Sequence, residues 1–401
     1  MNLEKQCIAT DSQKKYSNQH MINQYLKEYD EGGEKKRILL IDVNCKCSST
    51  GKIVYDLYKG IKADGRNAAI CYGRGKKIKE NNIFKFGIDI ETVIHAILAR
   101  ITGYNGCFSP LSTLRLIWFI KKYNPDMINI HELHAYFVNI KTLVNYIKKK
   151  EIPLIWTFHC EYMYTGKCGH AYDCMNFRNE CGNCPAVKEY PASLWFDRTY
   201  QMLKMKKKLL NDLEMTIITP SQWLADRVKQ SFLKDKKIRV INNGVDINTF
   251  SYQPIFELYK NLKIEGEKIV LFVAPDITSE RKGIKWVMQL SNLLQDLNVV
   301  FILIGGGEAP QIHSDNMLYV GRVDDENLLA KYYSMADVFL LCSEKETYSM
   351  TCAESLCCGT PVLGFKCGAP ETVFEGKNAT FVKYGDIEAL ETKLREILFG
   401  K

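Results

Sequence analysis

The sequence predicts an α/β protein with two Rossmann-like domains, each a parallel sheet with helices on both faces. Short apolar runs alternate with longer amphipathic segments in two series, and a weakly patterned stretch separates the two. Strands that alternate with helices favour parallel pairing and helical cover on both faces. The 401 residues are enough for two domains of ordinary size. We therefore expect two domains facing across a cleft, with ligands at the carboxyl ends of the strands.

The first series begins at the apolar run Arg37–Val43, which is typical of a strand buried on both faces. A polar loop follows, and Gly51 opens a helical pattern of apolar residues. The same criteria predict strands at 127–130, 154–158, 216–219 and 239–241, and helices at 116–123, 136–149 and 222–232.

The second series follows a turn signal at Asn242-Asn243-Gly244 and a stretch of weak pattern. It predicts strands at 269–273, 299–304, 317–320 and 336–342, and helices at 283–294 and 328–335. The expected divisions are a polar N-terminal tail or extra helix at 1–35 with a break at Gly32-Gly33, a first domain at 36–250, a linker at 251–266 and a second domain at 267–401.

The composition is typical of a soluble globular protein, with 46% hydrophobic residues, 25% charged residues and a mean hydropathy of −0.20. No apolar run reaches the length of a membrane span. The first 34 residues contain no signal-peptide core, so we expect a cytoplasmic protein. The 15 cysteines are an odd number, which favours reduced thiols over a secreted disulfide scaffold.

Charge is unevenly distributed. Residues 265–401 hold 13 Lys and Arg against 20 Asp and Glu, a net charge of −7, and the remaining 41 and 26 give residues 1–264 a net charge of +15. A basic first half suggests an anionic partner. Lysine runs at 148–150 and 206–208 fit either an anionic membrane surface or ordinary solvated helix faces. No nucleic-acid-binding signature is present.

Glu346 and Glu354, separated by seven residues, are the most informative motif. We expect Glu346 in a loop after an apolar strand, and Glu354 one to two turns into the next helix. A helix start offers backbone N–H groups and a positive dipole end that suit a phosphate. Carboxylates on either side of it can accept hydrogen bonds from sugar hydroxyls. This arrangement fits a sugar nucleotide, although two Glu at one spacing also occur by chance.

Further motifs follow one another in a fixed order. They are Ser49–Gly51, Asn129–Glu132, Thr219–Ser221, Asn242–Asp246, Glu280–Gly283, Leu303–Gly307, Val320–Val323, Glu346–Glu354, Gly359–Pro361 and Gly368–Glu371. In this order they resemble the motifs of the retaining GT-B glycosyltransferases of family 4, from about residue 36 to the C-terminus. Four more motifs are similar to those of a bacterial polysaccharide-building subgroup: Trp156–His159, Tyr164–Gly166, Cys181–Pro185 and Glu189–Ser193.

The resemblance implies a hexosyltransferase that moves a sugar from a UDP- or GDP-sugar. The acceptor would be a glycan or lipid-diphosphate-linked oligosaccharide in capsule, O-antigen or exopolysaccharide synthesis. It implies a protein of the cytoplasm, or of the inner face of the plasma membrane. No Asp-x-Asp motif follows a predicted strand, so we expect no catalytic metal.

The resemblance also assigns the donor site. Glu346 would contact the donor sugar and Glu354 the ribose. The backbone at Tyr348, Ser349 and Met350 would cradle the diphosphate, where Ser349 and Thr351 are candidate helix caps. Arg281 and Lys282 would neutralise the leaving diphosphate, or else lie in a solvated turn. Gly321 and Val323 match a glycine turn of the donor domain.

Three other positions complete the expected site. Gly51 would let backbone approach the donor phosphates, or simply start a helix. His131 would point into the cleft near the transferred sugar, although a lone His at a strand end is commonly structural. His134 is a weaker candidate that faces the acceptor. Asp276 is a departure, because many relatives have an additional Arg there, which leaves the donor's identity open.

A cysteine-rich insert at 159–185 is the candidate metal site. The cysteines are Cys168, Cys174, Cys181 and Cys184, with His159, Cys160 and His170 nearby. Their Cys-x2-Cys end has the spacing of a structural zinc site. Free thiols and a disulfide are the alternatives.

Two further choices stay open. The apolar segment Val93–Ile101 is either core or a helix lying on the membrane. The activity is either transfer, another GT-B reaction such as epimerisation or phosphorolysis, or none, as in a scaffold or partner subunit. Retention of Glu346, Lys282 and Gly51 favours transfer over a scaffold. A nicotinamide oxidoreductase is disfavoured, because Gly305–Gly307 does not form G-x-G-x-x-G after a first strand.

Overall fold

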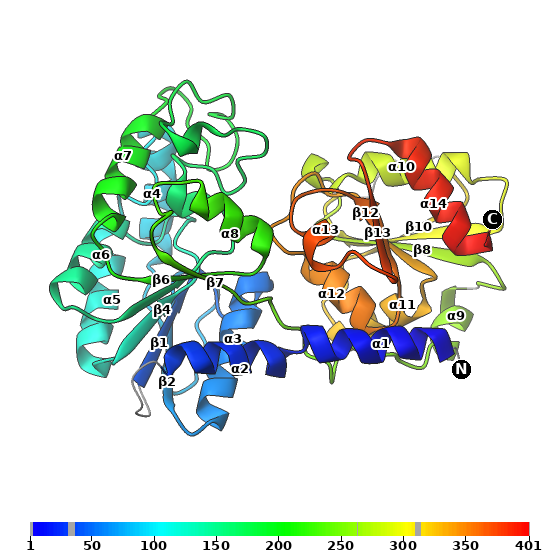
Figure 1. Cartoon of the computed structure of the whole chain (residues 1–401), viewed down its shortest axis with the longest axis horizontal. Coiled ribbons are helices and arrows are strands. Elements are labelled where there is room, and N and C mark those ends of the chain that lie inside the picture. The colour runs from blue at the N-terminus through cyan, green and yellow to red at the C-terminus, as the bar shows by residue number, and fades with distance from the viewer. Residues whose placement is uncertain (1–2, 31–36, 263, 309–313, 401) are drawn as a thin grey trace. The chain divides into compact units, whose positions relative to one another are not determined.

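The computed structural model describes residues 3–30, 37–262, 264–308 and 314–400, and the chain forms two compact units. The N-terminal unit is Ile22–Asn242, and the C-terminal unit is Asn243–Lys401 together with Met1–Met21. Each unit has one parallel sheet with helices around it (Figure 1). The predicted α/β class with two Rossmann-like domains is confirmed.

The sheet of the N-terminal unit has the order β3-β2-β1-β4-β5-β6-β7. Its strands are β1 (Arg37–Asp42), β2 (Asn67–Tyr72), β3 (Ile83–Lys85), β4 (Met127–Ile130), β5 (Leu154–Thr157), β6 (Thr216–Thr219) and β7 (Lys237–Val240). The chain leaves β1 in one direction and returns to its other side at β4, so the strand order reverses between these two strands. Rossmann-like sheets bind ligands at such a reversal, beyond the carboxyl ends of the strands.

Helices pack around this sheet. They are α2 (Asn18–Tyr29), α3 (Ser48–Ala63), α4 (Asp89–Thr102), α5 (Pro110–Tyr123), α6 (Ile140–Lys149), α7 (Thr199–Leu210) and α8 (Gln222–Lys229), with short 3-10 turns at Tyr162–Tyr164 and Asn176–Arg178. The central strands are buried along their whole length, as their continuous apolar sequences predict. None of the helices that the structure describes is long and apolar enough to cross a membrane.

The sheet of the C-terminal unit has the order β10-β9-β8-β11-β12-β13, with its reversal between β8 and β11. Its strands are β8 (Lys268–Asp276), β9 (Val299–Gly306), β10 (Met317–Gly321), β11 (Val338–Leu341), β12 (Val362–Phe365) and β13 (Ala379–Val382). Its helices are α1 (Leu3–Tyr16), α9 (Phe256–Leu262), α10 (Ile284–Leu293), α11 (Glu326–Met335), α12 (Met350–Cys357), α13 (Pro370–Val373) and α14 (Ile387–Phe399), with a 3-10 turn at Glu280–Lys282.

The boundaries differ from the expected ones at both ends of the C-terminal unit. Of the two alternatives for the first residues, the structure shows helix: α1 belongs to the C-terminal unit, where the Lys5 ammonium donates hydrogen bonds to the carbonyls of Ser334 and Ala336 at 2.9 and 2.5 Å. The expected linker, 251–266, contains α9. The Gly32-Gly33 break lies outside the described residues.

Candidate active site

Three charged residues of the C-terminal unit meet where the strand order of its sheet reverses. Arg281 and Lys282 follow β8, and Glu346 follows the neighbouring strand β11. The Lys282 Nζ lies 2.6 Å from Glu346 Oε1, and Arg281 Nη1 lies 3.7 Å from the same oxygen. The three side chains keep 19, 32 and 14% of their surface exposed, in the order Lys282, Arg281 and Glu346. Two cations and one carboxylate thus face solvent together where a Rossmann-like sheet binds its ligand.

Backbone geometry fixes this cluster. Gly283 has a φ of 78°, and a Cβ on it would lie 2.1 Å from the Cys342 carbonyl oxygen. Only glycine fits that position, so the turn carrying Arg281 and Lys282 packs directly on the end of β11. Glu346 is held by strand-like pairing, because its N–H donates to the Cys367 carbonyl at 2.9 Å and its carbonyl accepts from Ala369 at 3.0 Å.

Helix α12 begins beside Glu346. Of the two candidate caps, Ser349 is the N-cap, and its hydroxyl accepts a hydrogen bond from the Cys352 N–H at 3.3 Å. The first N–H groups of a helix have no carbonyl partner one turn back, so they form an anion site. Glu354 lies in the second turn, as expected, and accepts a hydrogen bond from the Tyr333 hydroxyl at 3.1 Å.

The other expected donor residues have mixed placements. Tyr348 is 3% exposed and its hydroxyl donates to the Asn243 carbonyl, so its side chain is not available to a ligand. Met350 is the first residue of α12. Gly321 ends β10, two strands from β8 in the sheet, and Val323 packs against the hydrophobic core. The Asp276 carboxylate accepts hydrogen bonds from Thr278 and so stabilises its own turn.

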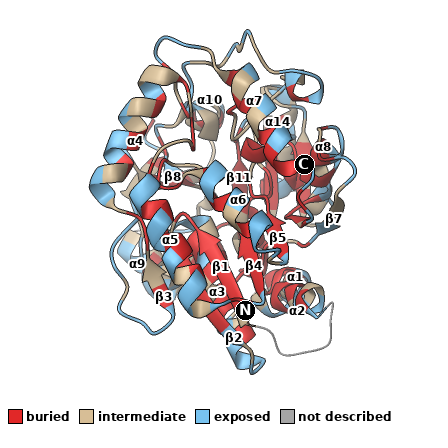
Figure 2. Cartoon of the chain, turned by 90° about the vertical axis from the view of Figure 1, so that its left-hand side faces the viewer, coloured by how far each residue is buried: buried red, intermediate tan, exposed pale blue. Residues whose placement is uncertain are grey.

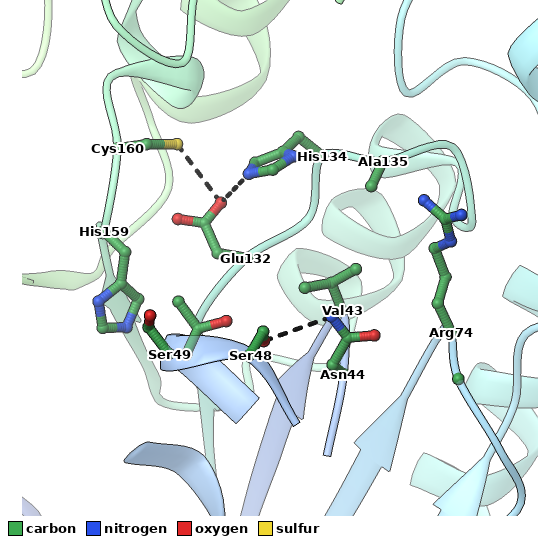
Figure 3. Close-up of a pocket in the computed structure, with 12 residues that line it drawn as sticks. Val43, Asn44, Ser48, Ser49, Arg74, Glu132, His134, Ala135, His159 and Cys160 are labelled. Carbon is green, nitrogen blue, oxygen red and sulfur yellow. Dashed lines mark hydrogen bonds and ion pairs between the residues drawn. The ribbon is translucent and has the colours of Figure 1, made fainter. Parts of the chain in front are cut away.

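The N-terminal unit has a pocket of about 670 Å³ at the carboxyl ends of β1, β2, β4 and β5 (Figure 3). It also lies at the reversal of its sheet. The lining residues are Val43, Asn44, Ser48, Ser49, Thr50, Arg74, Gly75, Glu132, His134, Ala135, His159 and Cys160. Most carry hydroxyl, amide, imidazole or charged groups, which suits a polar ligand with many hydroxyls.

Buried Asp42 joins the loops around this pocket. Its carboxyl oxygens accept hydrogen bonds from the N–H of Glu132 at 3.0 Å and from the hydroxyl of Thr50 at 3.2 Å. Burial raises the pKa of Asp42 to about 7. Gly51 lies in the first turns of α3, where a Cβ would come within 3.2 Å of Asn44. Gly51 therefore allows α3 to pack closely against the loop that follows β1.

His131 is not among the residues that line this pocket. It is 2% exposed, its Nδ1 lies 3.0 Å from His159 Nε2, and its ring stacks with that of Tyr25. Burial, together with the nearby His159, lowers the pKa of His131 well below its usual value. The imidazoles that do line the pocket are those of His134 and His159.

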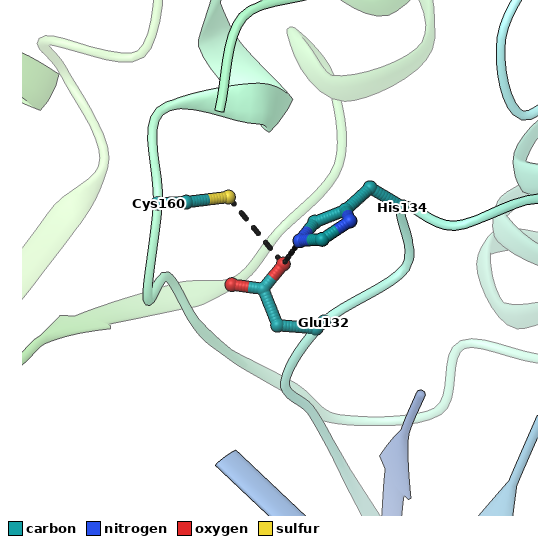
Figure 4. Close-up of side chains that lie close together, drawn as sticks. All are labelled: Glu132, His134 and Cys160. Carbon is teal, nitrogen blue, oxygen red and sulfur yellow. Dashed lines mark hydrogen bonds and ion pairs between the residues drawn. The ribbon is translucent and has the colours of Figure 1, made fainter. Parts of the chain in front are cut away.

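Three pocket residues form a cluster that no sequence motif connects. His134 Nε2 lies 2.9 Å from Glu132 Oε2, and the Cys160 thiol donates to the same oxygen at 3.4 Å (Figure 4). Burial opposes the charge on Glu132, but the nearby His134 outweighs it and lowers the pKa of Glu132 to about 2. Burial likewise opposes the charge on His134, but Glu132 raises the pKa of His134 well above its usual value. In the sequence, the available signal for this cluster was that its residues directly follow the strands β4 and β5.

The cysteine-rich insert is ordered by two buried lysines. Lys206 Nζ donates to the carbonyls of Tyr162, Thr165 and Gly166, and Lys167 Nζ donates to three further carbonyls. Cys168, Cys174, Cys181 and Cys184 are half-buried free thiols. Within the described ranges, the group of potential metal ligands whose ligand atoms all lie within 4.8 Å of one another is Glu132, His134 and Cys160. The four thiols of the insert do not meet this condition. Zinc at the four cysteines stays a prediction.

Comparison with known proteins identifies the class. The family described as Glycosyltransferase Family 4 matches residues 50–249, and that described as Glycosyl transferases group 1 matches residues 267–399. The chain belongs to these glycosyltransferases. A similar protein is the putative colanic acid biosynthesis glycosyl transferase WcaC of Escherichia coli, 24% identical over 90% of this chain and 92% of that protein.

Other comparisons agree. A Campylobacter jejuni N-acetylgalactosaminyltransferase acting on N,N'-diacetylbacillosaminyl-diphospho-undecaprenol is 28% identical over 43% of this chain and 48% of its own. The solved structure of Anabaena Alr3699/HepE with UDP-glucose superimposes with a TM-score of 0.61 at 14% identity, covering 91% of this chain and 90% of that one. WaaG, a glycosyltransferase involved in lipopolysaccharide biosynthesis, gives 0.60 at 14% identity, covering 90% of each chain. The predicted GT-B fold is confirmed.

Proposed function

We propose that this chain transfers a hexose from a nucleotide-sugar donor, with retention of anomeric configuration, to a glycan or lipid-diphosphate-linked acceptor in bacterial surface polysaccharide synthesis. The observation that carries the proposal is the cluster of Lys282, Arg281 and Glu346 beside the start of α12. Phosphate needs cations and N–H donors, whereas a sugar needs acceptors, and this cluster presents both. The WcaC and Campylobacter relatives support the acceptor class by their names.

In this reaction the bond between the anomeric carbon and the diphosphate oxygen breaks, and its electron pair stays on that oxygen. The acceptor hydroxyl oxygen bonds to the same face of the carbon, and its proton passes to the departing phosphate. Lys282, Arg281 and the N–H groups at the start of α12 stabilise the growing negative charge. Glu346 holds the sugar and Glu354 the ribose hydroxyls. In this proposal these groups replace a divalent metal at the leaving group.

The N-terminal unit supplies the acceptor contacts. His134 lines this pocket, and in this proposal His159 and the hydroxyls at the start of α3, which line it too, bind a polar acceptor. His131 acts as a positioning residue through its contact with His159. The Anabaena protein of the same fold contains UDP-glucose, so a UDP-sugar is the first of the two expected donor classes to test.

We further propose that the N-terminal unit contacts an anionic membrane at the cytoplasmic face. Figure 2 shows pale blue, exposed segments on α4 and α5. The exposed large apolar side chains of these two helices are Ile90, Val93, Ile94, Ile97, Leu111, Leu114 and Trp118. Exposed Arg115, Lys121 and Lys122 lie on the same helix α5, and the Lys122 ammonium is 5.3 Å from the Trp118 ring centroid. Apolar residues flanked by cations suit the boundary of an anionic bilayer.

Vesicle sedimentation tests the membrane contact. Leu114→Ser should reduce binding to vesicles containing phosphatidylglycerol, whereas Leu293→Ser, an exposed leucine of the C-terminal unit, should not. Equal binding by both variants and the unaltered protein would remove this part of the proposal.

Thermal shift with a panel of UDP-, GDP- and TDP-sugars, without added divalent cation, tests the donor site. One nucleotide class should raise the unfolding temperature, and Lys282→Ala or Glu354→Ala should diminish that shift. Lys285→Ala is the matched control, because this exposed lysine of α10 lies against Trp286 instead. No response to any sugar nucleotide would favour the scaffold alternative, and formation of an altered sugar nucleotide without transfer would favour an epimerase.

A further inference from the structure

We propose that Glu132, His134 and Cys160 form a zinc site in the N-terminal unit, with a fourth position open to the pocket (Figure 4). The three residues offer a carboxylate oxygen, an imidazole nitrogen and a thiol sulfur, which are the ligand types that zinc takes in proteins. Their ligand atoms all lie within 4.8 Å of one another.

The observed spacings are close to those that zinc imposes. A tetrahedral zinc with ligand distances of about 2.1 Å to N and O and about 2.3 Å to S separates its N and O ligands by roughly 3.4 Å, and its S and O ligands by roughly 3.6 Å. The structure has 2.9 Å between His134 Nε2 and Glu132 Oε2, and 3.4 Å between Cys160 Sγ and Glu132 Oε2. For these two pairs, an outward adjustment of a few tenths of an ångström reaches the tetrahedral spacing, and all three ligand atoms lie within 4.8 Å of one another.

Surrounding groups already orient the ligands. The ring nitrogen of His134 that faces away from the cluster, Nδ1, lies 3.4 Å from the Tyr190 hydroxyl, which leaves Nε2 for the metal. The Glu132 backbone is fixed by its hydrogen bond to Asp42, and the Tyr162 N–H donates to the Cys160 sulfur. Such outer contacts are typical of metal sites, because they fix ligand orientation before the ion binds.

Burial distinguishes this cluster from an exposed acidic patch. Glu132 is 6% exposed, and His134 and Cys160 are half-buried, yet all three line the pocket. Three protein ligands and access from the pocket describe an open site, whose fourth ligand is a water or an acceptor hydroxyl oxygen. The proposed zinc belongs to the acceptor-side pocket and takes no part in the departure of the nucleotide. Its binding can be tested without the transfer reaction.

Metal content is the test. The protein is purified under reducing conditions and equilibrated with buffered zinc. It should bind one equivalent at this cluster, besides any held by the cysteine-rich insert, and His134→Gln and Cys160→Ser should each weaken the binding of that equivalent by more than about 100-fold. That exceeds the roughly 10- to 100-fold loss expected for an outer contact such as Tyr190→Phe. Cys107→Ser, a half-buried thiol of the same unit, is the matched control and should retain the equivalent. Cys184→Ser should also retain it, which separates this site from the cysteine-rich insert.

A ligand exchange guards against variants that only misfold. With cobalt in place of zinc, Cys160→His should keep the equivalent but lose the sulfur-to-cobalt charge-transfer band of this site. Unchanged metal content in both His134→Gln and Cys160→Ser would overturn the proposal, leaving a hydrogen-bonded cluster only. Loss of the equivalent in Cys107→Ser as well would overturn its assignment to these three residues.

Discussion

Replacing Lys282 by methionine tests the donor site with the smallest change in shape. The substitution keeps an unbranched side chain but removes the ammonium that lies 2.6 Å from Glu346 Oε1. In the free protein, Glu346 then retains the longer contact of 3.7 Å with Arg281. When a nucleotide sugar binds, the same substitution removes a cation facing the diphosphate and leaves the Glu346 charge less well balanced.

The magnitude follows from the geometry. Two unit charges about 4 Å apart interact by about 4 kcal/mol at an effective dielectric constant of about 20. Removing one preorganised group that stabilises a developing anion typically costs about 2.7–4 kcal/mol, or roughly 100- to 1,000-fold in kcat. Since Lys282 is 19% exposed, solvent screens part of its interaction, and we expect a loss toward the lower end, about 100-fold.

The assay is nucleoside diphosphate release from the donor under saturating acceptor. Lys282→Met should lower kcat by about 100-fold and weaken nucleotide binding less, because the charge on the diphosphate grows in the transition state. Lys285→Met should leave both quantities unchanged. A Lys282→Met rate within about threefold of the unaltered enzyme would refute the assignment of the leaving-group charge to this lysine.

Three further predictions follow. Burial lowers the pKa of His95 to about 4, so on acidification the unfolded chain binds a proton at this residue before the folded chain does. Lowering the pH from 6.5 to 4 should therefore cost up to about 3 kcal/mol of stability. Urea unfolding of His95→Asn should show a smaller loss of stability over that range, and equal losses would contradict this prediction. Gly283→Ala should destabilise the C-terminal unit by more than about 2 kcal/mol, because a Cβ would lie 2.1 Å from the Cys342 carbonyl oxygen. An unchanged unfolding midpoint would show that the turn can move. In thermal unfolding, Ser349→Ala should cost about 1 kcal/mol of stability, because the helix cap is lost. Ser349→Gly should cost less, because Ser349 has a φ of 91°, which glycine adopts without strain. The reverse order would exclude backbone strain at this position.

Much of the fold could be predicted because its central strands are continuous apolar runs. The strands at 127–130 and 216–219 have the bounds expected from sequence. The helix α1 is polar along most of its length, and its amphipathic pattern is weak, so no feature of its sequence favoured helix over tail. Its stability comes from tertiary contacts such as that of Lys5 with the end of α11.

The cluster of Arg281, Lys282 and Glu346 could be predicted because its residues belong to short motifs next to strands. The pocket of the N-terminal unit could not, because the loop after β4 turns through left-handed residues. Ala135 and Tyr136 have φ values of 82° and 68°, and this path decides which neighbouring side chain faces the pocket. The contact of Cys160 with Glu132 crosses between loops after different strands, and no local spacing reports such a pair.

The most direct test of the account is turnover of the donor that the thermal-shift panel selects. Nucleoside diphosphate release is measured with a lipid-diphosphate-linked oligosaccharide acceptor and no added divalent cation. We expect acceptor-dependent release by the unaltered protein, a loss of about 100-fold or more in Glu346→Gln, and an unchanged rate in Lys285→Met. Equal release by Glu346→Gln and the unaltered protein would contradict the proposed donor site.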